Sequence, residues 1–242
     1  MTRDDRAPDL RHVRDWVFDL DNTLYPSECD LFSQVDARMA RFVAEYLQVD
    51  AVEARRIQKQ YYAEHGTTLN GLMQRHGLKP DAFLDFVHDI DLSVLDPAPE
   101  LAQAIDALPG RKFVFTNGSM GHAERVLAKL NIRHVFDDVF DIAASGFRPK
   151  PQRAAFDRMV EEFDIQPATS AMVEDLARNL QTAHALGFTT VLVQTRKDWS
   201  HEPKDARPAA PEDRHDHVHF ATENLTVFLK SADFFKPVDN QI

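Results

Sequence analysis

Two carboxylates stand two positions apart, directly after a short apolar run, in the segment DWVFDLDNTLYP (residues 15–26). They are Asp19 and Asp21, and the run before them is typical of a buried strand. Two like charges at the end of a buried strand repel one another unless a cation or a proton neutralises them. One carboxylate could act as a nucleophile and the other as a general acid and base. The pair is therefore either an ordinary turn with a helix cap or a catalytic pair with two roles.

Polar residues also stand at or soon after the ends of three later apolar runs. They are Thr116, Asn117 and Gly118 after RKFVF, Lys150 in GFRPKP, and Glu174 and Asp175 in SAMVED. Ligands of open parallel sheets bind beyond the carboxyl ends of the strands, so we expect these residues to meet Asp19 and Asp21. Each has an ordinary explanation when taken alone. Asn-Gly is a common turn signal, a single lysine is usually solvated, and Glu-Asp could cap a helix.

Together, the set offers ligands for a cation and donors for a phosphoryl group. The aspartates could bring three carboxylates to one place, and few carboxylates with room for water suit Mg²⁺. Lys150 and the hydroxyl of Thr116 could bind phosphate oxygens. Backbone amides at Gly118 and its neighbours could form an anion site at the start of a helix. Such groups stabilise a phosphoryl group in transfer, which one carboxylate could attack to form an aspartyl-phosphate.

The pattern of elements predicts an α/β doubly wound, Rossmann-like fold with a mostly parallel sheet and an inserted α-helical cap. The expected strands are 16–20, 111–118, 137–145, 170–176, 189–195 and 217–221. Helical patterns separate the strands between residues 111 and 195, and a long loop precedes the last strand. Residues 27–95 instead read as a run of helices without a strand. Helical insertions at the ligand end of a sheet commonly cover the site. We therefore expect a core domain of residues 1–26 and 100–242 and a cap domain of residues 27–99.

The composition is that of an acidic globular protein. The chain has 242 residues, 43% of them hydrophobic, and a formal net charge of −11, which argues against nucleic-acid polymers and anionic membranes as partners. Cys29 is the single cysteine, so no intrachain disulfide or thiolate metal cluster can form. The first residues lack the apolar segment of a secretory signal, and no run is long enough to span a membrane. We expect a cytoplasmic protein, and the oligomeric state stays open.

Four segments resemble, in order and context, the motifs of the haloacid dehalogenase superfamily of phosphohydrolases: DLDNTLY, FTNGS, the lysine of RPKP, and VEDLARN. The resemblance covers nearly the whole chain. It implies that Asp19 is the nucleophile and Asp21 the general acid and base. The phosphate contacts that it implies include Thr116 and Lys150. The ligands that it implies for Mg²⁺ are Asp19, the Asp21 carbonyl, Asp175 and, directly or through water, Glu174.

Within that superfamily, DNTLYP and the segment HGTTLNGLMQRHGLKPDAFLDFVH resemble the pyrimidine 5′-nucleotidase branch. This resemblance implies a small phosphorylated metabolite as partner, namely a nucleoside 5′-monophosphate. Dehalogenases as a group lack an acidic residue two positions after the nucleophile, so Asp21 favours phosphate-ester hydrolysis over carbon–halogen cleavage. A phosphatase of phosphoglycolate or a sugar phosphate, a phosphomutase, and a non-catalytic domain that senses a phosphorylated ligand are the alternatives, and Mn²⁺ could replace Mg²⁺.

Some polar residues allow two interpretations each. His215, His217 and His219 alternate, which on a strand would place them on one face, either as an edge or as a transition-metal site. The segment 196–215 is expected to be a long exposed loop. Residues that could serve either the site or an ordinary helix end or surface are His65, Thr67, Thr68 and Asn179.

Overall fold

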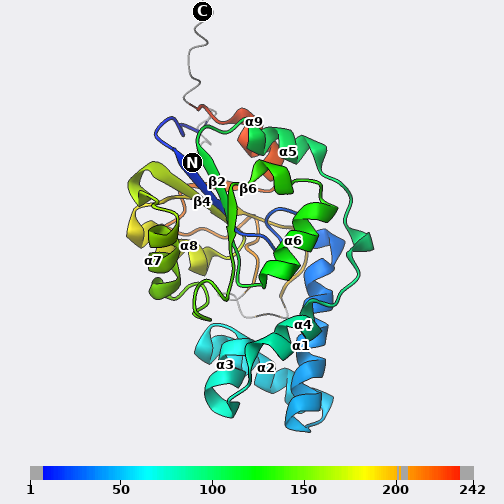
Figure 1. Cartoon of the computed structure of the whole chain (residues 1–242). Helices are drawn as coiled ribbons and strands as arrows, with labels where there is room; N and C mark the ends of the chain where they lie inside the picture. The colour runs from blue at the N-terminus through cyan, green and yellow to red at the C-terminus, as the bar shows by residue number, and fades with distance from the viewer. Residues whose placement is uncertain (1–7, 201, 203–206, 235–242) are drawn as a thin grey trace, which may run out of the picture.

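The computed structural model describes residues 8–200, 202 and 207–234 of the chain. Within this part, six parallel strands form one sheet in the order β3-β2-β1-β4-β5-β6 (Figure 1). The strands are β1 (Asp15–Phe18), β2 (Arg111–Phe115), β3 (Asp138–Phe140), β4 (Ser170–Glu174), β5 (Thr189–Val193) and β6 (Phe220–Thr222). The chain proceeds from β1 to one edge, returns to β4 beside β1, and continues to the other edge. The predicted doubly wound α/β fold is confirmed.

Both faces of the sheet are buried. Trp16 and Phe18 of β1 pack in one hydrophobic cluster, and Val17 between them packs in another on the opposite face. The first face is covered by α5 (Pro99–Asp106), α6 (Met120–Lys129) and α9 (Leu225–Ser231), and the second by α7 (Arg153–Glu162) and α8 (Ala177–Leu186). A strand that is covered on both faces needs apolar side chains on both, which explains continuous apolar runs such as FVF in β2.

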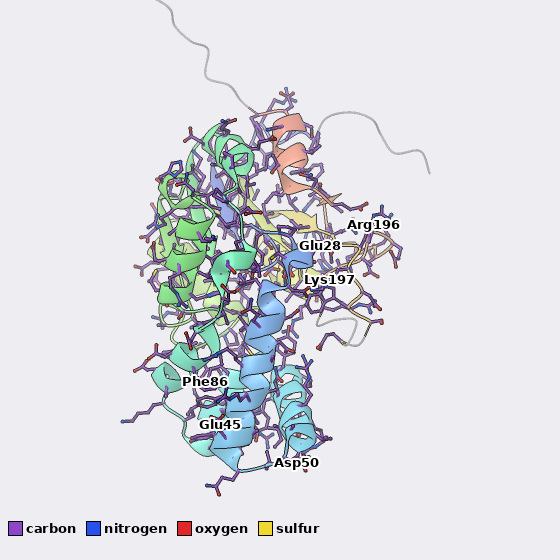
Figure 2. All side chains as sticks on the ribbon, turned by 90° about the vertical axis from the view of Figure 1, so that its right-hand side faces the viewer. Glu28, Glu45, Asp50, Phe86, Arg196 and Lys197 are labelled. Atoms are coloured by element: carbon purple, nitrogen blue, oxygen red, sulfur yellow. The ribbon has the colours of Figure 1, made fainter. Side chains whose placement is uncertain are left out.

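A group of helices lies between β1 and α5, and we call it the helical insertion. It consists of α1 (Leu31–Leu47), α2 (Ala51–His65), α3 (Thr68–His76) and α4 (Pro80–His88), which pack around a hydrophobic cluster of their own. Asp50 caps α2 by accepting a 2.9 Å hydrogen bond from the backbone of Glu53. Figure 2 shows Glu28 and Lys197 at the core end of α1 and Glu45 at its far end. None of the described helices is long and apolar enough to cross a membrane.

The last predicted strand begins later than expected, because β6 starts at Phe220 and the alternating histidines precede it. His217 donates from Nε2 to the carbonyl of Ala177 at 2.7 Å. His219 Nδ1 instead lies 2.8 Å from the hydroxyl of Thr190. These two histidines therefore bind different neighbours, and among the described residues the histidines of this segment do not form a group that could hold a metal ion.

The segment 196–215 is less exposed than predicted, although its residues 201 and 203–206 lie outside the described part. Its buried residues are Trp199, Pro208 and Ala209. The backbone of Thr195 donates a 2.9 Å hydrogen bond to the carbonyl of Ala209, which fixes the returning part of the segment beside the end of β5. The expectation of an exposed loop is wrong for these residues, because their apolar side chains cover the carboxyl end of the sheet.

Candidate active site

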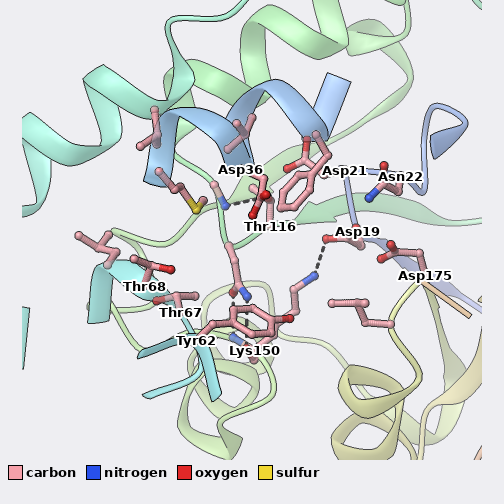
Figure 3. Close-up of a pocket in the computed structure, with 18 of the residues that line it drawn as sticks. Asp19, Asp21, Asn22, Asp36, Tyr62, Thr67, Thr68, Thr116, Lys150 and Asp175 are labelled. Atoms are coloured by element: carbon pink, nitrogen blue, oxygen red, sulfur yellow. Dashed lines mark hydrogen bonds and ion pairs between the residues drawn. The ribbon is translucent and has the colours of Figure 1, made fainter. Parts of the chain in front are cut away.

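The structure brings the eight predicted site residues to the carboxyl edge of the sheet, where all of them line one pocket. Asp19 and Asp21 follow β1, and Thr116, Asn117 and Gly118 follow β2. Lys150 lies in the loop before α7, and Glu174 and Asp175 stand at the end of β4. The three strands are neighbours in the sheet and run parallel, so their carboxyl ends lie side by side. Figure 3 shows Asp19, Asp175 and Lys150 facing one another across this pocket.

Lys150 is the centre of the charge network, although only 1% of it is exposed. Its ammonium group donates to Asp19 Oδ1 at 2.6 Å, to Glu174 Oε1 at 2.8 Å and to the Phe115 carbonyl at 2.8 Å. Three acceptors satisfy all three donors of the ammonium group. Burial alone would lower the pKa of Lys150, but the carboxylates of Asp19 and Glu174 raise this pKa above its usual value. The side chain is therefore a fixed positive charge beside Asp19.

Asn117 holds the backbone of Lys150 in place. Its Oδ1 accepts a 2.8 Å hydrogen bond from the Lys150 amide, and its Nδ2 donates to the Lys150 carbonyl at 3.2 Å. The side chain of Asn117 is thus committed to Lys150, and a phosphate contact would have to come from its backbone amide. The amide of Gly118 donates to Thr116 Oγ1 at 2.9 Å, so a bound phosphate would compete with that hydrogen bond.

Glu174 positions Lys150 and has little capacity left for other partners. Its Oε1 also accepts a 2.5 Å hydrogen bond from Asn179, and its Oε2 accepts one of 2.8 Å from the backbone of Leu176. Burial would raise the pKa of Glu174, but Lys150, followed by the Leu176 amide and Asp175, holds this pKa below its usual value. Asn179 lies on the first turn of α8 and is buried, so it serves the site and is not a surface residue.

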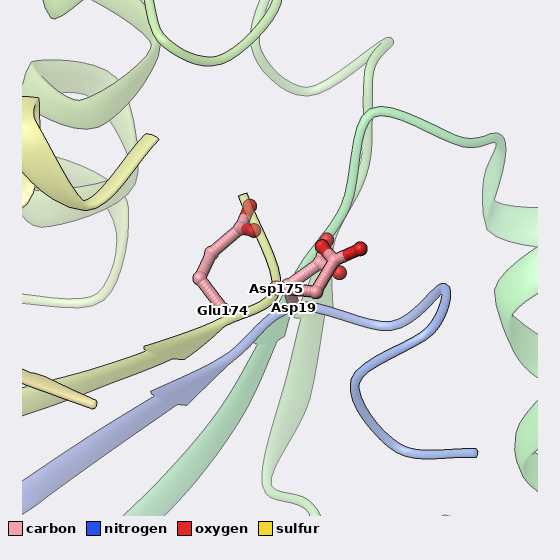
Figure 4. Close-up of side chains that lie close together, drawn as sticks. All are labelled: Asp19, Glu174 and Asp175. Carbon is pink, nitrogen blue, oxygen red and sulfur yellow. The ribbon is translucent and has the colours of Figure 1, made fainter. Parts of the chain in front are cut away.

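Three carboxylates gather where a cation could be bound (Figure 4). Oxygens of Asp19, Glu174 and Asp175 lie within 4.8 Å of one another, and all three residues are buried. Burial, followed by repulsion from Glu174 and Asp19, raises the pKa of Asp175 well above its usual value. Burial and Glu174 also raise the pKa of Asp19, although Lys150 opposes them. One lysine does not balance three carboxylates, so the donor set fits a hard divalent cation such as Mg²⁺.

Asp21 has partners of a different kind from those of Asp19. Its Oδ1 accepts hydrogen bonds from the Tyr25 hydroxyl at 2.6 Å and from His122 Nε2 at 2.8 Å. Burial would raise the pKa of Asp21, but His122 and Tyr25 together hold this pKa below its usual range. The two aspartates that stand two positions apart in the sequence thus occupy separate environments. Neither Tyr25 nor His122 was singled out from the sequence, because each looks like an ordinary buried residue of its segment.

The helical insertion and the segment 196–215 supply the rest of the pocket wall. The apolar lining residues of the insertion include Phe32, Met39, Leu69, Phe83 and Val87, and the polar ones include Asp36, Gln58, Lys59, Tyr62, Thr67 and Thr68. Thr67 caps α3 and also lines the pocket, whereas His65 lies outside the lining residues; contact between Thr67 and a substrate stays a prediction. Lys59 forms ion pairs with Asp36 at 3.1 Å and with Glu202 at 2.5 Å. The pair with Glu202 connects the insertion to the segment beyond β5, and the sequence offers no local signal for it.

Comparison with known proteins agrees with this geometry. Residues 16–187 match the family model of haloacid dehalogenase-like hydrolases. The chain is 25% identical over 208 residues to Phosphate metabolism protein 8 of Saccharomyces cerevisiae, an alignment that covers 78% of this chain but only 64% of the yeast protein. The structure of a HAD phosphatase from Thermococcus onnurineus matches with a TM-score of 0.57 and 16% identity, over 91% of this chain and 99% of that one.

An L-2-haloacid dehalogenase matches with a TM-score of 0.55 and 15% identity, over 91% of this chain and 100% of that one. At such identities the two structural matches establish the fold alone. The family match shows more than the fold, because it is a match of the sequence itself over residues 16–187, which contain Asp19, Lys150 and Asp175. This chain belongs to the haloacid dehalogenase-like hydrolases.

Proposed function

We propose that the protein is a Mg²⁺-dependent phosphomonoesterase that acts through a phospho-Asp19 intermediate. The observation that carries this proposal is the division of labour between the two aspartates. Asp19 lies 2.6 Å from the ammonium group of Lys150, and this positive charge reduces the repulsion between a carboxylate nucleophile and an anionic phosphoryl group. Asp21 is held apart from Asp19 by hydrogen bonds from Tyr25 and His122. A domain that merely binds a phosphorylated ligand needs neither a nucleophile nor a separate proton donor.

The first step transfers the phosphoryl group to the enzyme. A carboxylate oxygen of Asp19 bonds to phosphorus, the bond from phosphorus to the ester oxygen breaks, and Asp21 gives its proton to the departing oxygen. Thr116 donates its hydroxyl to a phosphoryl oxygen, and Lys150 exchanges one of its three partners for another phosphoryl oxygen. In the second step a water oxygen bonds to phosphorus while Asp21 takes up a proton from that water, and phosphate leaves Asp19 restored.

The cation completes the charge balance of this site. Bound by Asp19, Asp175 and the carbonyl of Asp21, Mg²⁺ would offset the repulsion between the carboxylates and an incoming phosphoryl group. Both oxygens of Glu174 already accept hydrogen bonds from the protein, which supports contact between Glu174 and the cation through water.

The proposed substrate is a nucleoside 5′-monophosphate, and UMP or CMP are the first choices. We propose that residues 27–99 act as a cap over a core of residues 1–26 and 100–242, and that this cap excludes bulk water from the reaction. Phe32, Met39 and Phe83 give the cap side of the pocket an apolar surface that suits a flat base. Phosphoglycolate has no apolar part to use that surface, and a sugar phosphate uses it poorly, so both remain the second choice.

The test is phosphate release from UMP, CMP, AMP, phosphoglycolate and sugar phosphates, with Mg²⁺ and with EDTA, together with halide release from 2-chloropropionate. We expect release of phosphate that needs the metal and is fastest for a pyrimidine nucleotide. Asp19→Asn should abolish it while its circular dichroism spectrum is unchanged, and Asp85→Asn on the exposed face of α4 should behave as wild type. Activity close to wild type in Asp19→Asn would eliminate the mechanism. Release that favours another ester would keep the mechanism and change the substrate.

A further inference from the structure

Two stacked histidines join the helical insertion to Asp21. His122 lies on α6 of the core and His88 ends α4 of the insertion. Their ring centroids are 4.4 Å apart and their planes differ by 12°. The side chain of His122 is fully buried, and His88 is 6% exposed. His122 Nε2 donates the 2.8 Å hydrogen bond to Asp21 Oδ1, so the stack ends on the proposed general acid and base.

The two hydrogen bonds to Asp21 select one of its oxygens. Tyr25 and His122 both donate to Oδ1, whereas Oδ2 accepts no hydrogen bond from the described residues. Two donors on Oδ1 fix the orientation of the carboxyl group and leave Oδ2 to carry the proton for the leaving group. The side chain of Asp21 lines the same pocket as Thr116, and we expect the leaving group of a bound ester to lie in this pocket.

Stacking, and not a second hydrogen bond, keeps the ring of His122 in place. Its Nδ1 is buried and has no hydrogen-bond partner within the described part of the chain. Gly118 lies against the edge of the ring pair. A Cβ atom at Gly118 would lie 3.1 Å from Cδ2 of His122 and 3.7 Å from Nε2 of His88. The ring of His122 is therefore held by His88 on one face, with Gly118 at its edge.

His88 is itself fastened to the start of α6. A 3.0 Å hydrogen bond links its Nδ1 to the hydroxyl of Ser119, which also caps α6. The guanidinium group of Arg125, one turn after His122, donates to the carbonyl of His88. The end of α4 thus contacts the core at the helix that carries His122. Movement of the insertion away from the core would take the His88 ring off the ring of His122.

We propose that His122 is a positioning residue that presents Oδ2 of Asp21 to the leaving oxygen, and that His88 makes this positioning depend on the docked insertion. The inference rests on the proposed phosphatase function and extends it to protonation of the leaving group. An alkyl phosphate needs that proton, because an alkoxide is a poor leaving group. p-Nitrophenyl phosphate does not need it, because its leaving group is a stable anion.

The experiment compares kcat/KM for UMP, or the best alkyl ester of the panel above, with kcat/KM for p-nitrophenyl phosphate. For each ester, kcat/KM reports the steps through departure of the leaving group and is independent of the later hydrolysis of phospho-Asp19. We expect His122→Ala to lower kcat/KM for the alkyl ester on the order of 100-fold and for p-nitrophenyl phosphate by less than about threefold. His88→Ala should lower kcat/KM for the alkyl ester, relative to p-nitrophenyl phosphate, by a smaller factor. His134 is exposed, so His134→Ala should leave both kcat/KM values unchanged.

His122→Gln is the second variant, because its amide can still donate a hydrogen bond to Asp21. It should recover most of the activity on the alkyl ester, which a purely structural role would not require. Equal losses on both esters in His122→Gln or His122→Ala would overturn the inference and leave the phosphatase function intact. Absence of phosphate release from either ester by the wild-type enzyme would remove the proposed function and this inference with it.

Discussion

Asp175→Asn removes one carboxylate of the buried group and tests whether the site is built for a cation. Oxygens of Asp19, Glu174 and Asp175 lie within 4.8 Å of one another. Two unit charges at that separation repel by about 3.5 kcal/mol at an effective dielectric constant of about 20. Asp175 is repelled by two carboxylates and attracted by Lys150, so the net repulsion is about that of one pair. Uptake of a proton relieves part of it, and we expect the variant to gain about 1–3 kcal/mol without metal at about pH 8.

The dependence on pH has a definite sign. The folded-state pKa of Asp175 lies well above its usual value because of burial, Glu174 and Asp19. Between the unfolded and folded pKa values, the folded protein binds more protons than the unfolded chain, so stability falls as the pH rises. The free energy of unfolding of the metal-free wild type, measured in urea from about pH 5 to about pH 8, should fall along this range. The slope should be smaller in Asp175→Asn.

Added Mg²⁺ should raise the Tm of the wild type more than the Tm of Asp175→Asn, which is opposite to the difference expected without metal. A ligand at 100 times its Kd stabilises the folded state by about 2.7 kcal/mol, which for a chain of this size raises Tm by about 5–10 °C. We expect this rise in the wild type and in Asp85→Asn, and almost none in Asp175→Asn. An Asp175→Asn protein that is less stable than wild type without metal, yet keeps the full response to Mg²⁺, would refute the reasoning.

Two further substitutions test the network and the insertion. Lys150→Ala leaves the carboxylates of Asp19 and Glu174 without their cation, so it should lower the free energy of unfolding by about 3–5 kcal/mol and abolish phosphate release. Urea unfolding and phosphate assays measure the two effects, and a variant that stays stable and active would contradict this expectation. Gly71→Ala places a Cβ 2.4 Å from Cβ of Tyr61, where α3 packs on α2. It should lower stability by about 1–3 kcal/mol with the site intact, and an unchanged Tm would show that the two helices separate at little cost.

The fold could be predicted because the relevant signals are local. Apolar residues at helical spacing predict a helix from residue 31 to about 47, and α1 spans Leu31–Leu47. Strands alternating with helices allow few topologies once crossovers are right-handed, which is why the sheet follows from the pattern. The expected strand at 217–221 starts too early, because alternating histidines have the same spacing as the polar face of an edge strand. Their side chains bind neighbouring elements instead, and β6 begins only at Phe220.

The core of the site could be predicted for a related reason. Strand ends of a parallel sheet meet at one edge, so the polar residues that follow β1, β2 and β4 had to meet there. The sequence could not reveal which oxygen binds which donor. Lys59 and Glu202 lie 143 positions apart and form an ion pair only because the insertion and the last loop meet above the sheet. His122 stands on the buried face of a helix, where a histidine usually serves only packing.

Two of the contacts between the insertion and the core differ in physical character. On one side, Lys59 and Glu202 form a charge pair at the edge of the pocket, and Lys59 is 30% exposed, so salt and water weaken the pair. On the other side, the stack of His88 on His122 is buried and lies behind Asp21. In the proposed mechanism, the buried contact behind Asp21 is the one that bears on proton transfer. His88 reaches His122 only where the end of α4 meets α6, so we expect Asp21 to be oriented only while the insertion lies against the core.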